Sequence, residues 1–167
     1  CYEPFQDKNV RIAIQKAIDT ETITTQYYGL DASEFDLFGI WSDSTNWSSV
    51  DQWDDELKDE FKYDPDAAKQ LLADAGYPDG FDLEFCYSSD AGQSTRDLAA
   101  IVKDMWGQIG VNVILREIDD GSFLDMRKSG EIQCYTSNWS ADFNDPDNFI
   151  YTFWFTKSCL SFNCSCN

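Results

Sequence analysis

The sequence predicts an α/β protein in which helices flank a small mixed or parallel β-sheet. Amphipathic helices are expected over residues 64–76 and 94–110, where apolar side chains recur with helical spacing. Each is followed by a short run in which apolar and polar residues alternate, as they do in strands. Because strand, helix and strand follow one another over residues 81–115, the expected connection is a right-handed crossover between parallel strands.

Composition indicates a folded domain and excludes some partners. We expect residues 1–167 to form a single domain, since 43% apolar and 16% aromatic residues provide a core that offsets the entropy of ordering. Twelve basic residues against 31 acidic ones give a net charge of −19, which disfavours binding to nucleic acid or to anionic lipid headgroups. No apolar run reaches the roughly eighteen residues that a membrane-spanning helix needs.

The amino-terminal third combines one clear helix with a less regular stretch. A helix is expected over residues 7–20, and residues 51–61 are expected to form a short acidic helix. Four apolar residues share one stripe of the first helix: Val10, Ile14, Ala17 and Ile18. Residues 27–53 lack sustained periodicity and predict an irregular surface excursion.

The central helices carry recognisable end signals. Asp64 is the expected N-cap of the first, Pro65 suits its first helical position, and Gly76 ends it. In the second, Ser94 and Asp97 predict a capping box. The remaining expected elements are strands over residues 81–85, 111–115 and 132–139 and a short helix over residues 121–128.

The cysteines favour an oxidising compartment. There are six of them: Cys1, Cys86, Cys134, Cys159, Cys164 and Cys166. This exceeds what a cytosolic protein of this size needs, and six cysteines allow 15 pairings between which the sequence does not choose. A zinc site is not expected, because the chain has no histidine and no second cysteine pair at zinc-ribbon spacing.

No catalytic motif or cofactor motif is present, and the chain is not expected to be an enzyme. It has no histidine to act as a base, no glycine-rich phosphate loop and no nucleophile elbow. Acidic residues are so abundant that a pair of carboxylates carries no information about catalysis. The acidic segment 142–148 lacks the calcium-loop pattern, since Pro146 takes a ligand position.

Four motifs, in the same order as in the family, resemble the bacterial oligopeptide/dipeptide-binding proteins. They are Pro4-Phe5-Gln6-Asp7 with Val10-Arg11, Tyr63-Asp64-Pro65 with Leu71-Leu72, Ile109-Gly110-Val111, and Trp139-Ser140-Ala141-Asp142 with Asp145-Pro146. The resemblance runs through nearly the whole chain. It implies one lobe of a periplasmic-binding-protein-like fold, with residues 1–167 as the second lobe and the first lobe absent.

The resemblance also implies a function in transport. Members of the family are two-lobed solute receptors of ABC importers, extracellular or periplasmic, and the full-length protein is expected to be a membrane-tethered lipoprotein. The implied partners are a small peptide, the missing first lobe and the membrane subunits of the importer. The alternative is a lobe retained for sensing or interaction without a transport role.

Ligand-binding residues are implied by the last motif. Asp142 matches the family aspartate that pairs with the α-ammonium group of a peptide, and Trp139 is expected to line the same cleft. No arginine lies shortly before Trp139, so the recognition of the peptide carboxylate is left open. We also expect a disulfide between Cys159 and either Cys164 or Cys166, and free buried thiols at Cys86 and Cys134.

Overall fold

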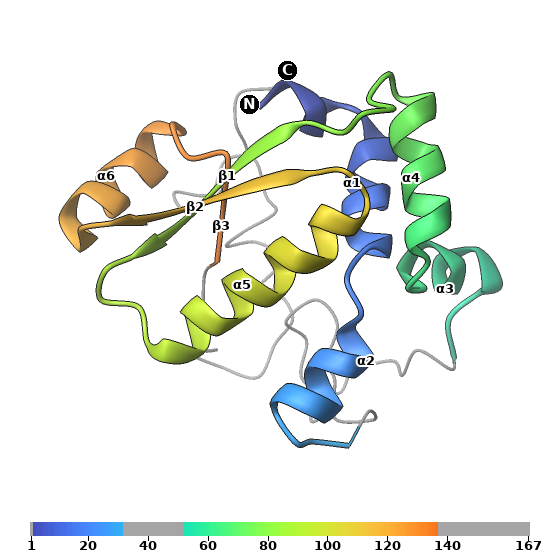
Figure 1. Ribbon diagram of the computed structural model, residues 1–167, viewed down its shortest axis with the longest axis horizontal. Helices are drawn as coiled ribbons and strands as arrows, with labels where there is room; N and C mark the ends of the chain where they lie inside the picture. Colours follow the sequence, from blue (N-terminus) through green and yellow to red (C-terminus); the bar gives the residue numbers. More distant parts are fainter. Residues whose placement is uncertain (1, 32–51, 137–167) are drawn as a thin grey trace. The chain divides into compact units, whose positions relative to one another are not determined.

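A computed structural model of the chain describes residues 2–31 and 52–136 (Figure 1). Residues 2–18 and 62–136 belong to one compact unit, and residues 19–31 and 52–61 belong to a second. The expectation of a single domain over residues 1–167 stays a prediction.

The first unit confirms the predicted α/β class. Its elements are η1 (Glu3–Gln6), α1 (Lys8–Lys16), α4 (Pro65–Asp74), β1 (Asp82–Ser88), α5 (Gln93–Gln108), β2 (Asn112–Ile118), α6 (Asp120–Ser129) and β3 (Cys134–Tyr135). The strands form one sheet in the order β2-β1-β3, and β1 is parallel to both neighbours. The predicted strand–helix–strand crossover is therefore present as β1–α5–β2.

The pairing of β1 with β2 is much longer than the pairing of β1 with β3. The β1–β2 register runs from Asp82 opposite Asn112 to Ser88 opposite Ile118. Among the described residues, two pairs join β3 to β1, and the side chain of Gln133 extends this contact by accepting a bond from the Glu84 N–H at 2.8 Å. The strand predicted over residues 132–139 starts later than expected, and its positions after residue 136 lie outside the described residues.

The main core lies between one face of the sheet and the helices α1, α4 and α5. Figure 1 shows α1 and α4 side by side, with α5 running along the sheet. Trp106 of α5 is the central side chain, because its indole N–H donates to the Ile14 carbonyl of α1 at 3.0 Å and its ring lies 6.1 Å from that of Phe85. The buried residues of this core are Val10, Ala13, Ala17, Ala68, Leu72, Leu83, Phe85, Ala99, Trp106, Ile109, Val111 and Val113.

A smaller core lies on the opposite face of the sheet, under α6. Cys86 and Ile118 from the sheet pack there with Phe123 and Ile132. The ring of Tyr135 meets that of Phe123 edge-on, with centroids 5.9 Å apart. The helix α6 therefore covers the end of this face where the strands terminate.

Aspartates cap three helices of the first unit, as short polar side chains do at N-termini. Asp64 accepts from the Ala67 N–H at 2.9 Å, which confirms the predicted N-cap of α4. Asp7 and Asp119 do the same for α1 and α6. The predicted capping box at Ser94 is wrong: α5 begins at Gln93, its N-cap is Gly92 without a side-chain bond, and Ser94 lies inside the first turn.

The described part of the second unit, residues 19–31 and 52–61, contains short helices. They are α2 (Thr20–Thr22), the π-helical segment η2 (Ile23–Tyr27) and α3 (Asp55–Phe61). Asp19 caps α2 through the Thr22 N–H at 2.9 Å, so the first predicted helix is shorter than its expected range of residues 7–20. The acidic helix expected over residues 51–61 is present as α3, with Trp53 packed against Phe61. Residues 32–51 of the predicted excursion lie outside the described residues.

None of the helices in residues 2–31 and 52–136 has the length and apolar character required to cross a membrane.

Two glycines allow the amino ends of β1 and β2 to pack backbone against backbone. Gly80 has a φ of 75° and Gly110 a φ of 90°, conformations that L side chains rarely adopt. A Cβ atom on Gly80 would lie 1.8 Å from the Gly110 carbonyl oxygen. The turns that precede the two strands therefore have no room for a side chain at residue 80.

We expect Gly80→Ala to destabilise the chain by about 3 kcal/mol, because a backbone overlap is added to the cost of a left-handed conformation. Gly76→Ala is the matched control: Gly76 also has a positive φ, of 93°, but a Cβ atom added there would meet no other atom within 4 Å. The control should lose only about 1 kcal/mol. Urea denaturation measures both, and equal losses would show that the contact between the two turns is unimportant.

Cys86 and Cys134 are free thiols on opposite faces of the sheet, as expected, although only Cys86 is fully buried and Cys134 is half-buried. Cys86 is fully buried under α6, whereas Cys134 packs against the main core on the other face. Burial, together with the neighbouring carboxylate of Glu84, raises the pKa of Cys86 to about 11. Burial also raises the pKa of Cys134 to about 12. The disulfide predicted for Cys159 lies outside the described residues.

We expect Cys86 in the folded chain to react with iodoacetamide at pH 8 on the order of a hundredfold more slowly than in the unfolded chain, because its thiolate fraction is reduced. The rate should rise with pH up to about 11. Since the folded state holds this proton more tightly than the unfolded chain, the associated stability is complete below about pH 8.5 and is lost as the pH rises towards 11. Equal rates in water and in urea, measured by mass spectrometry, would contradict this assignment.

Candidate functional site

The parallel sheet places the ends of its three strands at one edge. β1 ends at Ser88, β2 at Ile118 and β3 at Tyr135, and we call this the carboxyl edge. In open parallel α/β sheets, ligands bind outside the carboxyl ends of the strands, where loops rather than helices face the solvent. The carboxyl edge is therefore the candidate site.

Two strand–helix connections are joined at this edge. The Ser89 N–H donates to the Ile118 carbonyl at 2.7 Å, which extends the β1–β2 ladder by one bond. The Ser88 hydroxyl donates to Asp120 at 2.8 Å and accepts from the Asp90 N–H at 3.1 Å. Hydrogen bonds thus join the β1–α5 loop (residues 89–92) to the start of α6.

The electrostatic character of the carboxyl edge is acidic. Asp90, Asp119 and Asp120 are all exposed there. Hydrogen bonds from Ser122 hold the pKa of Asp119 below its usual range, so this carboxylate is ionised at neutral pH. Such a surface favours a cationic group of a ligand over an anionic one.

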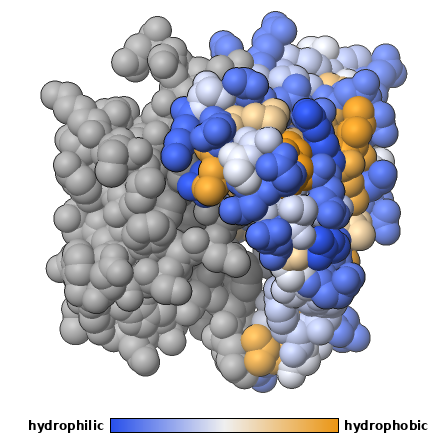
Figure 2. Space-filling view, turned by 90° about the vertical axis from the view of Figure 1, so that its left-hand side faces the viewer, coloured by the Kyte–Doolittle hydropathy of each residue, from blue (hydrophilic) through white to orange (hydrophobic). Residues whose placement is uncertain are grey.

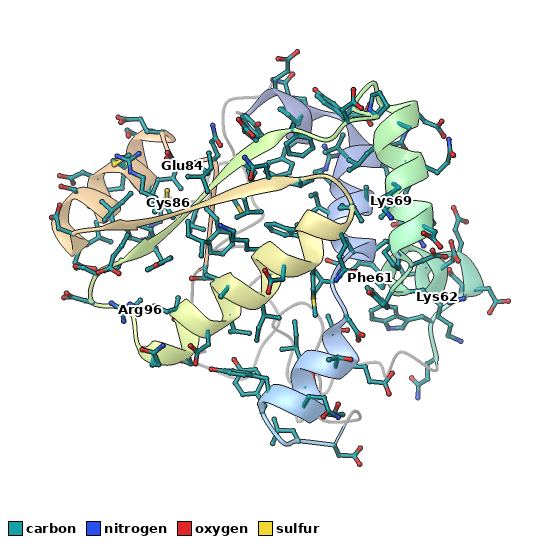
Figure 3. The ribbon with its side chains drawn as sticks, in the orientation of Figure 1. Phe61, Lys62, Lys69, Glu84, Cys86 and Arg96 are labelled. Atoms are coloured by element: carbon teal, nitrogen blue, oxygen red, sulfur yellow. The ribbon has the colours of Figure 1, made fainter. Side chains whose placement is uncertain are left out.

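Arg96 is a cation in this acidic region, but its donors are already engaged within the protein (Figure 3). Its Nη2 donates to the Ser89 carbonyl at 2.8 Å, its Nη1 donates to the Ala91 carbonyl, and its Nε lies 3.4 Å from Glu117. The role of this residue was not predicted from the sequence. Its position in the sequence could have indicated a special role. An arginine in the first turn of a helix interacts unfavourably with the helix dipole, so a compensating partner is expected.

The two site residues predicted from the sequence, Trp139 and Asp142, lie outside the described residues. What the structure describes is the strand before them, which ends at Tyr135 on the carboxyl edge. The distance of these two residues from the β1–α5 loop is therefore not described.

Other kinds of site find less support in the described residues. Within residues 2–31 and 52–136, no group of three or more His, Cys, Asp or Glu side chains is placed to hold a metal ion. An open groove of about 320 Å³ lies at the opposite end of β2, against the last turns of α5. The surface seen in Figure 2 is mostly hydrophilic where its residues are described.

The chain matches a known protein family over most of its length. Residues 2–158 match the family described as bacterial extracellular solute-binding proteins, family 5 Middle. Among curated relatives, heme-binding protein A of Haemophilus influenzae is 32% identical over 153 residues, which cover 88% of this chain and 26% of that protein. The chain thus spans about a quarter of the length of this relative.

Solved structures of similar proteins include complexes with peptides. A dipeptide-binding protein from Pseudoalteromonas in complex with Met-Leu has a TM-score of 0.72 and 28% identity, over 90% of this chain and 29% of that one. An ABC transporter-associated periplasmic binding protein from Helicobacter pylori, in complex with the peptide STSA, has a TM-score of 0.66 and 28% identity, over 90% and 28% of the two chains. The match of the family over residues 2–158 shows that the chain belongs to the family 5 bacterial extracellular solute-binding proteins.

Proposed function

We propose that this chain is the second lobe of a two-lobed receptor that captures peptides and delivers them to an ABC importer. The observation that carries the proposal is the direction of β3. This strand is parallel to β1 and ends at Tyr135 on the carboxyl edge, the edge at which such sheets bind ligands, and Trp139 and Asp142 come within seven residues of it in the sequence.

In this proposal Asp142 pairs with the α-ammonium group of the peptide, and Trp139 lines the cleft beside it. A carboxylate in a closing, water-poor cleft binds an ammonium through charge-assisted hydrogen bonds. The negative charges of Asp90, Asp119 and Asp120 also favour the binding of a positively charged group. Because every peptide with a free amino terminus carries this ammonium, the contact tolerates many ligand sequences.

The proposed receptor operates outside the cytoplasm, in the periplasm or tethered to the outer face of the cell membrane. Its other partners are a first lobe, supplied by the same full-length protein, and the membrane subunits of the importer. Support comes from the family match and from the peptide-bound and ABC transporter-associated relatives. Closure of two lobes on a hinge is the conformational change expected for such a receptor.

Heme is a second candidate ligand, because one curated relative with 32% identity is named heme-binding protein A. The exposed carboxylates of the carboxyl edge favour the ammonium of a peptide over the propionate groups of a heme. Titration of the two-lobed receptor with hemin and with trialanine in parallel separates the two candidates.

Replacing Asp142 by Asn in the two-lobed receptor keeps the size of the side chain and removes its charge. A charge-assisted hydrogen bond contributes about 1.5–3 kcal/mol, so the affinity for trialanine should fall by about tenfold to a hundredfold. Isothermal titration calorimetry measures the change. N-acetylated trialanine, which has no ammonium group, should bind weakly to wild type and variant alike.

Asp145→Asn and Asp147→Asn are the matched controls, because they make the same change in charge within the same acidic segment. We expect both to retain most of the affinity for trialanine. An unchanged affinity in the Asp142 variant would remove this residue from the site. A receptor that binds hemin but no free-amine peptide would replace the proposed ligand class.

A further inference from the structure

The start of α5 lacks two features that usually stabilise the N-terminus of a helix. Its N-cap is Gly92, which provides no side-chain bond, and its first turn contains no acidic residue. Arg96, the fourth residue of the helix, instead places a positive charge close to the positive end of the helix dipole. Departures from local preference in a natural sequence concentrate at functional or strained positions, where another interaction compensates for them.

The compensation for Arg96 is its set of bonds to the carboxyl edge. The guanidinium group reaches back from α5 to the carbonyls of Ser89 and Ala91 and to the carboxylate of Glu117 near the end of β2. The side chain is 31% exposed, so these bonds are partly shielded from water. A planar guanidinium with five N–H donors can serve three acceptors together, whereas a lysine ammonium acts as a compact point charge.

These bonds fix the conformation of the β1–α5 loop. With the carbonyls of Ser89 and Ala91 held towards Arg96, the loop folds on itself through the Asp90 N–H to the Ser88 hydroxyl and the Ala91 N–H to the Ser88 carbonyl. Asp90 is thereby presented to solvent on the carboxyl edge. A loop that is already ordered loses less conformational entropy when it contacts a ligand.

We propose that Arg96 is a positioning residue, which holds the β1–α5 loop in its binding conformation before the ligand arrives. The inference rests on the proposed function, since the loop is taken to line the ligand site. Arg96 acts through the loop, and its donors are used within the protein.

The test compares Arg96→Met with Arg116→Met. The control also removes a guanidinium that is paired with a glutamate, because Arg116 lies 2.9 Å from Glu84 on the sheet. Amide hydrogen exchange in the ¹⁵N-labelled 167-residue chain reports on loop order without any ligand. We expect the amides of Asp90 and Ala91 to exchange about tenfold faster in Arg96→Met and at the wild-type rate in Arg116→Met. Ser89, whose N–H bonds to Ile118 across the strands, should stay protected in both.

The second readout is the affinity of the two-lobed receptor for trialanine, measured by calorimetry. We expect about a tenfold loss in Arg96→Met, comparable to one net hydrogen bond, and none in Arg116→Met. A merely structural role would lower the unfolding temperature of both variants and leave the affinity of the folded receptor unchanged. If Arg96→Met does not fold, Arg96→Lys keeps the charge and should show the same changes at smaller size.

The outcomes separate the two proposals. Unchanged exchange at Asp90 and Ala91 in the Arg96 variants would overturn the positioning role. Faster exchange with unchanged trialanine affinity would show that the loop is not part of the ligand site, which overturns the inference and leaves the proposed function standing. Failure of the wild-type receptor to bind any free-amine peptide would refute the proposed function and, with it, the role of Arg96 in binding peptides.

Discussion

The parallel ladder between β1 and β2 is the constraint on which the rest of the described fold depends. Parallel neighbours need a crossover connection, so α5 must return along the whole sheet before β2 can begin. The ladder is bounded at one end by the close approach of Gly80 and Gly110 and at the other by the bond from Ser89 to Ile118. With both ends fixed, the beginnings of α5 and α6 come together at the carboxyl edge.

The ends of a helix could be predicted from the sequence where neighbouring residues determine them. They could not be predicted where contacts with other segments determine them. Helix α4 was predictable because Asp64, Pro65 and Gly76 act within one turn of each end. The start of α5 was not, because it depends on bonds from Arg96 to the preceding loop and to β2 rather than on a capping side chain. Asp142 was singled out through its family motif alone, since one aspartate in so acidic a chain has no distinguishing local chemistry.

A common fold with variable loops explains how proteins of one family can bind different solutes. The relatives are named for heme and for dipeptides, although the matched part of each is similar to this chain. A common fold does not fix the ligand, because specificity depends on the side chains and loops carried at the binding edge. In this chain the loops at the carboxyl edge are acidic, and the Ser88 hydroxyl joins them through hydrogen bonds with Asp90 and Asp120.

The separation of Cys86 and Cys134 by the sheet has a consequence for oxidative folding. The two residues are close in register, since Cys134 lies opposite Phe85, but their side chains leave the sheet on opposite faces and cannot be bridged there. A chain that joined them before the sheet had formed would have to reopen that bond before β1 and β3 could pair. Excluding this one bridge removes 3 of the 15 ways of pairing six cysteines, so a sheet that has already formed limits which thiols an oxidant can join.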